Sequence, residues 1–409
     1  MGRWAIIADD LTGALDTALQ FHKVGLKTIV SSRPNVWPVD NQVTAITTET
    51  RHIDAGRAAA RVRASAHARL LEAPSPIYKK TDSLLRGNVA VELRALLDSL
   101  NVATLVFSPA FPSGGRTTVD GVHKINGIPV ADAEPGHDPV TPVRESHIPS
   151  LLRTNTNISA STVPLSVIRA GPNAIATAFE THRTSGTEIL VPDVETDNDL
   201  KAIVTAMEAT NLTAVSAGSA GLAEHLAQQC ALTPLRPPRL AQSSFVAAIV
   251  GTPNRHTRTQ VERVVAIAKT RLVHVHSMSA LVHALAEAKS AWKSNHGVIF
   301  DATASGPSPD CGQRKEQLQV IRAMCFALAS DISGLGLILT GGDTARVALE
   351  GLGVEAIEIV DEIEWGVPVG HTYGSSKLTI PIVTKGGTMG STNALVAAFR
   401  RLQMKRFSA

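Results

Sequence analysis

Residues 3–25 read RWAIIADDLTGALDTALQFHKVG, and this stretch decides the fold. The apolar run over 3–8 predicts a buried strand, and residues 11–25 predict a helix that ends at Gly25. Asp9 and Asp10 stand between the two elements. A strand that leads directly into a helix is the unit of parallel α/β sheets, which bind ligands beyond the carboxyl ends of their strands. The sequence therefore predicts an α/β domain with two carboxylates at its ligand-binding edge.

The alternation of strands and helices continues along the chain, which predicts a largely parallel sheet flanked by helices. Residues 109–147 interrupt it with a polar stretch rich in glycine and proline, which we expect to be a functional or disordered loop. The proline-rich segment 231–244 lacks periodicity and predicts a linker. We therefore expect two α/β domains, over 1–230 and 245–409, with an active-site cleft between them.

The composition excludes several classes of protein. Of the 409 residues, 44% are hydrophobic and 18% charged, as in globular proteins. A net charge of +3 and an aromatic share of 4% argue against nucleic-acid binding. The three cysteines form no Cys-x-x-Cys pair, which indicates a reducing compartment and no structural zinc. With no apolar run of about 18 residues and no signal-peptide pattern, we expect a cytoplasmic enzyme with small-molecule partners and no membrane, and leave a homodimer open.

Asp9 and Asp10 form the first candidate site. Adjacent carboxylates repel one another, so they need partners. They can accept hydrogen bonds from sugar hydroxyls, hold a metal or act as a general base. Helix capping by an aspartate or by Thr12 is the alternative, and it stays open for Thr12.

A second group of polar residues follows the strand predicted at 77–80, in the segment YKKTDSLLRGN (78–88). A small carboxylate substrate needs such a mixture of cations, an acid and hydroxyls. Arg51 follows another strand and can grip a carboxylate with two hydrogen bonds. Arg116, in SPAFPSGGRTT (108–118), can meet an anion where glycines let the backbone approach it. The candidate substrate-binding residues are Asp9, Arg51, Lys80, Thr81, Asp82, Ser83, Arg86 and Arg116.

In the second half, three glycine-containing turns follow strands and precede helices, at 250–254, 339–344 and 384–390. Backbone N–H groups in such turns bind phosphate, and three of them favour a nucleotide site. The P-loop and dinucleotide fingerprints are both absent from the sequence. The candidate nucleotide-binding residues are Asn254, Gly341, Gly342, Asp343, Thr344, Gly386 and Gly387.

Several motifs together resemble the four-carbon acid-sugar kinase family. They are IIADDLTGALDTA, TTETR, YKKTDSLLRGN, FPSGGRTT, SAGSAGL, LTGGDT and TKGGTMG, in that order. The resemblance implies an N-terminal domain that binds the acid sugar, with Asp9, Arg51 and Lys80 to Ser83 as contacts. It implies a C-terminal domain that binds ATP through Asn254, Gly341 to Thr344 and Gly387.

The sequence is thus interpreted as an ATP- and Mg²⁺-dependent kinase. We expect it to phosphorylate the terminal (4-) hydroxyl of a four-carbon acid sugar such as D-threonate, D-erythronate or 3-oxo-tetronate. Asp9, Asp10 and Asp82 all remain candidates for the catalytic base, and no metal ligands are assigned. Arg51, Lys80 and Arg86 would neutralise the carboxylate and the transferring phosphoryl group. The alternatives are a sugar-acid dehydrogenase or aldolase, and a non-catalytic sugar-acid binding protein.

Overall fold

The computed structural model describes residues 4–33, 42–70, 76–138, 141–230, 240–294, 297–303, 311–373 and 379–403. The chain divides into two compact units, Met1–Leu235 and Arg236–Ala409. Both are α/β, as the sequence predicts. Of the predicted linker 231–244, residues 231–239 lie outside the described part of the chain. The domain limits 1–230 and 245–409 therefore stay a prediction.

The sheet of the first unit consists of eight described strands, all of them parallel to their neighbours. Both faces of such a sheet are covered, so its strands are almost continuously apolar. In spatial order the strands are β2 (Thr28–Ser31), β3 (Val43–Thr47), β1 (Trp4–Ala8), β4 (Ile77–Lys80), β11 (Val215–Gly218), β5 (Leu105–Ser108), β10 (Ile189–Pro192) and β9 (Ala160–Val163).

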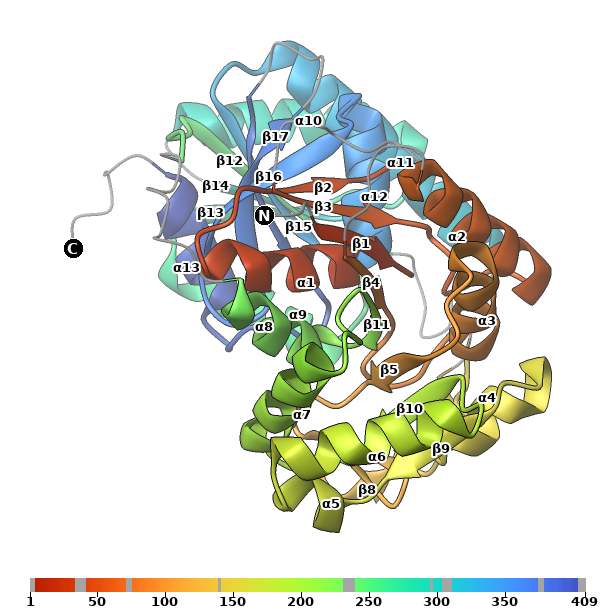
Figure 1. Ribbon diagram of the computed structural model, residues 1–409. Coiled ribbons are helices and arrows are strands. Elements are labelled where there is room, and N and C mark those ends of the chain that lie inside the picture. Colours follow the sequence, from red (N-terminus) through yellow and green to blue (C-terminus); the bar gives the residue numbers. More distant parts are fainter. Residues whose placement is uncertain are drawn as a thin grey trace. The chain divides into compact units, whose positions relative to one another are not determined.

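The helices of this unit pack in two rows (Figure 1). One row contains α1 (Leu11–Lys23), α8 (Ala220–Gln229), α7 (Asp197–Ala209), α6 (Pro172–Thr184) and α5 (Leu165–Arg169). The other contains α2 (Ala55–Leu70), α3 (Val89–Leu100) and α4 (Ile148–Thr156). Side chains of the second row join Ala5, Ile7 and Ile46 from the strands in one buried apolar cluster.

The prediction of one long loop over 109–147 is wrong, because short strands and 3-10 helices lie within that stretch. It holds a second, antiparallel sheet of β6 (Arg116–Val119), β7 (Val122–Ile125) and β8 (Ile128–Pro129), with short 3-10 helices at Pro112–Gly114 and Glu134–His137. The pairs Asp120-Gly121 and Asn126-Gly127 make the two turns, and all four residues have positive φ. Asp-Gly and Asn-Gly are the dipeptides that favour tight hairpins, so this signal was present in the sequence.

The second unit has a sheet of seven described strands, of which the first five in spatial order are parallel and the last two antiparallel. They are β13 (Thr270–His274), β14 (Gly297–Asp301), β12 (Phe245–Val250), β15 (Leu335–Thr340), β18 (Pro381–Lys385), β17 (Pro368–Tyr373) and β16 (Ala356–Glu362). Two helices pack together over one apolar cluster, α9 (Arg255–Ile267) and α13 (Ala394–Leu402). Three others form a second packed row, α10 (Met278–Lys293), α11 (Cys311–Asp331) and α12 (Gly342–Leu352). Within the described part of the chain, no helix has the length and apolar character needed to cross a membrane.

Candidate active site

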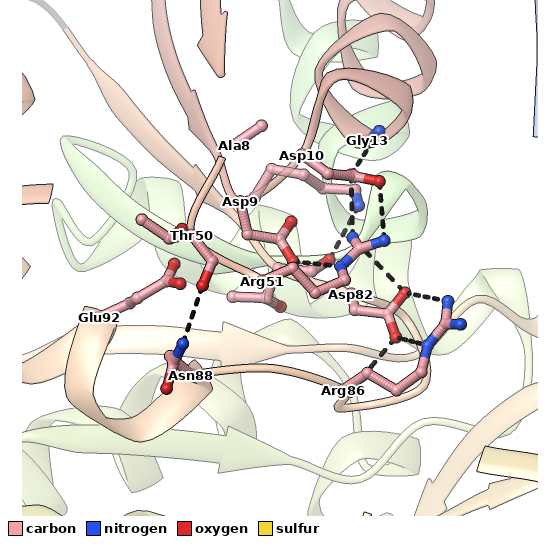
Figure 2. A network of polar contacts seen from close by, with 12 residues as sticks. Ala8, Asp9, Asp10, Gly13, Thr50, Arg51, Asp82, Arg86, Asn88 and Glu92 are labelled. Carbon is pink, nitrogen blue, oxygen red and sulfur yellow. Dashed lines mark hydrogen bonds and ion pairs between the residues drawn. The ribbon is translucent and has the colours of Figure 1, made fainter. Parts of the chain in front are cut away.

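The strands β3, β1 and β4 are neighbours in the first sheet, with Ala8 paired to Thr47 on one side and to Lys80 on the other. Their carboxyl ends therefore lie together, and so do the residues that follow them. Figure 2 shows Asp9 and Asp10 after β1, Arg51 after β3, and Asp82 and Arg86 after β4 in one network. The structure thus brings together the candidate residues of the first two groups.

Arg51 is the centre of this network. Its Nε donates to Asp9 Oδ2 at 2.8 Å, while Nη1 and Nη2 donate to Asp10 Oδ2 and Oδ1 at 2.7 and 2.9 Å. Asp82 Oδ1 lies 3.7 Å from Nη2. The pKa of Arg51 is raised well above its usual value because these three carboxylates outweigh the opposing effect of burial. The two-pronged grip expected on a substrate carboxylate is, in this structure, a grip on Asp10.

Glycine at position 87 allows Arg51 to reach this place. Gly87 has a φ of +85°, and a Cβ there would lie 3.0 Å from Arg51 Cγ and 3.1 Å from its Cα. The Asn88 side chain donates to the carbonyls of Thr50 and Ile53 at 2.8 and 2.9 Å, which fixes the backbone on both sides of Arg51. Gly87 and Asn88 therefore both help to fix the position of the segment around Arg51.

Asp10 has a second role as the cap of α1. Its Oδ1 accepts a hydrogen bond from the Gly13 N–H at 2.8 Å, and its own φ of −145° is extended, as expected for an N-cap. Thr12 lies inside the helix, so the capping residue is Asp10 and not Thr12. Both oxygens of Asp10 are thus engaged by the protein.

Asp82 is also fully engaged. Arg86 Nε donates to Asp82 Oδ2 at 2.7 Å, and the Arg86 N–H donates to the same oxygen at 3.2 Å. Burial raises the pKa of Asp82, but Arg86 and Arg51 outweigh it and hold the pKa far below its ordinary value. The pKa of Arg86 is raised in turn, mainly by Asp82. Asp138 Oδ2 lies 3.5 Å from Arg86 Nη1 and adds a further acid at the edge of the group.

Asp9 differs from Asp10 and Asp82 because the described residues offer no hydrogen-bond partner to one of its oxygens. The residue is 3% exposed, and Oδ1 is buried without a hydrogen-bond partner among the described residues. Burial raises the pKa of this carboxyl, but Arg51, Lys80 and Lys79 together outweigh burial, so the pKa lies below its ordinary value. Asp9 is therefore an ionised carboxylate with an unused acceptor.

The remaining candidates of the first unit lie around this group. Lys80 is buried, and its ammonium donates to the Thr81 carbonyl at 2.8 Å. The Ser83 carbonyl accepts a hydrogen bond from His123 Nε2 at 2.9 Å. Arg116 begins β6 and bonds the Gly114 carbonyl through Nη1, whereas its Nε is buried with no partner in the described part of the chain. Burial lowers the pKa of Arg116, and the charges of Asp82 and Arg86 also act on it, which places it near them.

Two residues behind the site carry a buried ion pair that the sequence reasoning missed. Lys79 Nζ lies 2.6 Å from Glu92 Oε2, and the side chains are 0% and 1% exposed. The signal in the sequence was Lys79, which lies inside the strand predicted at 77–80. A buried ammonium group there needs a partner. Glu92 is in the first turn of α3, where a carboxylate is favoured by the helix dipole.

His123 is a further buried residue that links the small antiparallel sheet to the segment after β4. Because the Ser83 carbonyl can only accept, His123 Nε2 carries the proton, and Nδ1 accepts from the Thr118 hydroxyl at 3.0 Å. Burial lowers the pKa of His123 to about 4 from 6.5, so the ring is neutral at pH 7.

We expect this histidine to make folding sensitive to acid. The unfolded chain binds the proton below pH 6.5 and the native state only below about 4, so stability is lost as pH falls through that window. The loss attributable to His123 should be about 2–3 kcal/mol. Urea unfolding at pH 7, 5.5 and 4.5 tests this against His123→Gln, which keeps a donor and an acceptor but does not titrate. Equal pH dependence in both proteins would contradict the assignment.

The glycine turns of the second unit also converge. The strands β12, β15 and β18 are neighbours, so the turns after them lie at the same edge of the sheet. A Cβ at Gly251 would lie 2.2 Å from Thr344 Oγ1, and one at Gly387 would lie 3.2 Å from Thr252 Oγ1 and 3.3 Å from Asn254 Cβ. A side chain at Gly251 would therefore clash, and one at Gly387 would be crowded, where the three turns meet.

The helix that begins at this place has no side-chain cap. Gly341 is the N-cap of α12, with a φ of +103°, so the first N–H groups of the helix are not taken up by a capping side chain. Asp343, in the first turn of α12, is paired with Arg314 of α11 at 2.5 Å. The side chain of Asn254 caps α9 by accepting from the His256 N–H at 2.9 Å. A glycine-lined edge with an uncapped helix N-terminus fits the phosphates of a nucleotide. For Mg²⁺ the described residues offer no group of three or more His, Cys, Asp or Glu side chains.

The fold and these two sites are those of a two-domain α/β enzyme. The family model "Sugar-binding N-terminal domain" matches residues 4–226, and the model "Nucleotide-binding C-terminal domain" matches residues 247–395. The chain belongs to the four-carbon acid-sugar kinase family, which confirms the resemblance inferred from its motifs.

Relatives named as kinases of four-carbon acid sugars match nearly the whole chain. D-threonate kinase of Bordetella bronchiseptica is 31% identical and covers 98% of both chains. D-threonate kinase of Salmonella typhimurium is 29% identical over 96% of both chains, and D-erythronate kinase of Heliobacterium modesticaldum is 28% identical over 96% of this chain and 95% of its own. A crystal structure from Salmonella typhimurium, titled as a putative tRNA synthase, is 24% identical and superposes with a TM-score of 0.84 over 98% of this chain and 100% of that one, which supports the fold.

Proposed function

We propose that this protein transfers the γ-phosphoryl group of ATP to the terminal (4-) hydroxyl of a four-carbon acid sugar such as D-threonate, D-erythronate or 3-oxo-tetronate. Family membership and the names of the relatives support the class of reaction. The observation that carries the proposal is the free Oδ1 of Asp9, a buried carboxylate oxygen at a strand end of the sugar-binding domain.

Asp9 is the base or hydroxyl contact in this proposal. Of the three aspartates, Asp10 and Asp82 have their oxygens taken by Arg51, Arg86 and backbone N–H groups, which leaves Asp9 to accept from a substrate hydroxyl. Its lowered pKa suits phosphoryl transfer, because catalysis there relies on orienting the nucleophile more than on strong proton abstraction.

The cations around Asp9 would neutralise the substrate carboxylate. Lys80 has no carboxylate within 4.0 Å among the described residues, and Arg116 has an unused Nε donor. Arg51 can also contribute if a substrate oxygen shares its guanidinium with Asp9 and Asp10. Thr81 and Ser83 would contact hydroxyls, and Arg86 would face the transferring phosphoryl group.

Arg51→Ala is expected to raise the acid-sugar KM by about ten- to a hundredfold, since a charge-assisted bond contributes about 1.5–3 kcal/mol. It should lower kcat as well, because Arg51 also holds Asp9 in place. Arg51→Lys should recover only part of the loss, since lysine cannot make the planar two-pronged contact. Steady-state kinetics with both substrates varied provide the measurement. A change confined to the ATP KM would contradict this division of roles.

For ATP, the three turns that converge in the second unit are the proposed phosphate contacts, with Gly342, Thr344, Gly386 and Gly387 supplying backbone N–H groups. The Gly341 N–H is bonded to the Lys385 carbonyl, so Gly341 would contribute by letting the backbone approach the phosphates without a side chain. Asn254 and Asp343 line the same turns. Mg²⁺ usually keeps several waters and binds through phosphates and few protein carboxylates, which agrees with the absence of a dense ligand cluster in the described residues.

The proposal is tested by incubating the protein with Mg²⁺-ATP and each candidate acid, followed by measurement of ADP release and of the phosphorylated product. The screen should include D-threonate, D-erythronate, 3-oxo-tetronate and a branched sugar acid. ADP release that depends on the acid separates a kinase from a dehydrogenase, an aldolase and a binding protein. If none of the acids is phosphorylated, the substrate assignment is wrong. The cytoplasmic location and the homodimer stay predictions, the latter to be tested by sedimentation.

A further inference from the structure

Lys385 ends β18 with a buried ammonium group. The residue is 2% exposed, and its Nζ donates to Thr257 Oγ1 at 3.1 Å and to the Gly386 carbonyl at 2.9 Å. Thr257 Oγ1 in turn donates to the Gly387 carbonyl at 2.7 Å. The ammonium is therefore attached directly to the Gly386–Gly387 turn.

Among the residues that the structure describes, the hydrogen-bond partners of this ammonium are neutral oxygens. Among the described residues no carboxylate lies within 4.0 Å of it, whereas the equally buried Lys79 of the first unit is paired with Glu92 at 2.6 Å. A buried charge without a counter-ion is costly, so a chain that uses lysine only for structure gives it an acid. Burial lowers the pKa of Lys385 to about 8, with Glu364 acting in the opposite direction.

The surroundings of the turn are suited to an incoming anion. A Cβ at Gly387 would lie in tight contact with Thr252 and Asn254, and Gly341 leads into the uncapped helix α12. The Gly341 N–H donates to the Lys385 carbonyl at 2.9 Å, which joins the two turns. An anion that binds at the Gly386–Gly387 turn would therefore lie close to the Lys385 ammonium.

We propose that Lys385 supplies, through the Gly386–Gly387 turn, the positive charge that attracts the polyphosphate chain of the nucleotide. The inference rests on the proposed function and deepens it, because it assigns a charge to a site otherwise built from backbone N–H groups. Lys385 is therefore a positioning residue. Its hydrogen bonds hold the Gly386–Gly387 turn, and its charge makes the electrostatic potential there more positive.

Several other titratable or charged groups belong to the elements and turns around Lys385. They are Glu364, His256, Arg255, the ion pair of Arg258 with Asp301, the ion pair of Asp343 with Arg314, and His371 of β17. A variant that removes only Lys385 separates its titration from theirs.

The test compares the parent protein with Lys385→Met, which keeps the length and apolar stem of the side chain. Isothermal titration calorimetry at pH 7 would use ATP, inorganic tripolyphosphate and adenosine as probes. We expect the variant to bind ATP and tripolyphosphate roughly tenfold more weakly or worse, and adenosine as well as the parent does. The ligand-free variant should melt no lower than the parent, because it has lost an uncompensated buried charge.

The pH dependence gives a second measurement that a structural role would not change. A bound polyphosphate favours the charged ammonium, so the affinity of the parent for tripolyphosphate should fall as pH rises from 7 to about 9.5, through the pKa of about 8. Lys385→Met should show a smaller pH dependence. Unchanged tripolyphosphate affinity in the variant, or the same pH dependence in both proteins, would overturn the inference.

The same probes separate this inference from the proposed function. A parent protein that binds tripolyphosphate but neither ATP nor adenosine would contradict the kinase proposal and the nucleotide as ligand, while a Lys385 effect on tripolyphosphate would still support the role of Lys385 in attracting a polyphosphate. A parent that binds ATP with an affinity that Lys385→Met leaves intact would overturn the inference alone. Binding of none of the three probes would contradict both.

Discussion

Asp9→Asn is expected to lower kcat on the order of a hundredfold or more, with the affinity for ATP nearly unchanged. The substitution keeps the shape of the side chain but removes its charge. Asp9 Oδ1 is a buried carboxylate oxygen with no hydrogen-bond partner among the described residues, so it is available to orient the attacking hydroxyl and accept its proton. An amide at this position has neither the negative charge nor the basicity for that role.

The matched control is Asp10→Asn. It removes the same charge from the same network, and asparagine caps a helix about as well as aspartate does, so α1 should keep its cap. Because both Asp10 oxygens are engaged by Arg51 and the Gly13 N–H, we expect a smaller loss of kcat than for Asp9→Asn. Measurement of kcat, both KM values and the ATP Kd for the two variants decides between them. If Asp10→Asn were the more damaging for turnover, the base would have to be reassigned.

The sequence predicted the two-domain α/β class because it depends on local signals. The apolar run over 4–8 followed by a capped helix makes β1 and α1 recognisable without any tertiary information. The hairpins over 116–129 carried an equally local signal, the Asp-Gly and Asn-Gly turns, which the polar composition of the stretch obscured. The helices α4 to α6 and strand β9 lie in a further stretch for which the sequence reasoning gave no elements.

The candidate site could be predicted from the sequence only as far as the order of the strands in the sheet could be predicted. Residues after neighbouring parallel strands must meet, which explains why Asp9, Arg51 and Asp82 lie together. Which carboxylate pairs with which cation is decided by side-chain geometry over distances of a few ångströms, and no spacing in the sequence encodes it. The two-pronged grip of Arg51 on Asp10 and the free oxygen of Asp9 emerged only from the structure.

The candidate nucleotide site could be predicted only to the same extent. The positions of the turns were predictable, but the conformation of each glycine was not. Positive φ belongs to Gly341, at +103°, while Gly342 is already the first residue of α12. Lys385 lies within the motif TKGGTMG, but what distinguishes it from a surface lysine is its burial with no carboxylate partner in the described part of the chain.

Gly341→Val is expected to weaken ATP binding on the order of a hundredfold, while acid-sugar binding in the other unit is spared. A Cβ at Gly341 would lie 3.2 Å from Thr344 Oγ1 and 3.5 Å from Thr252 Cβ, so branched carbons would occupy the edge where the turns meet. The loss of charge-assisted contacts of about 3 kcal/mol in total accounts for an effect of that size. Calorimetric titration with ATP measures it.

Backbone strain at Gly341 has to be separated from steric blocking, because valine is disfavoured at positive φ wherever it occurs. Gly171 provides the matched control: it is the N-cap of α6 in the first unit, has a φ of +100°, lacks a side-chain cap, and has no atom within 4 Å of a built Cβ. Gly171→Val should therefore lower the melting temperature to a similar degree and leave ATP affinity unchanged. If Gly341→Val bound ATP as tightly as Gly171→Val does, the phosphates would not lie against the Gly341 turn, and the nucleotide site would have to be sought elsewhere in the second unit.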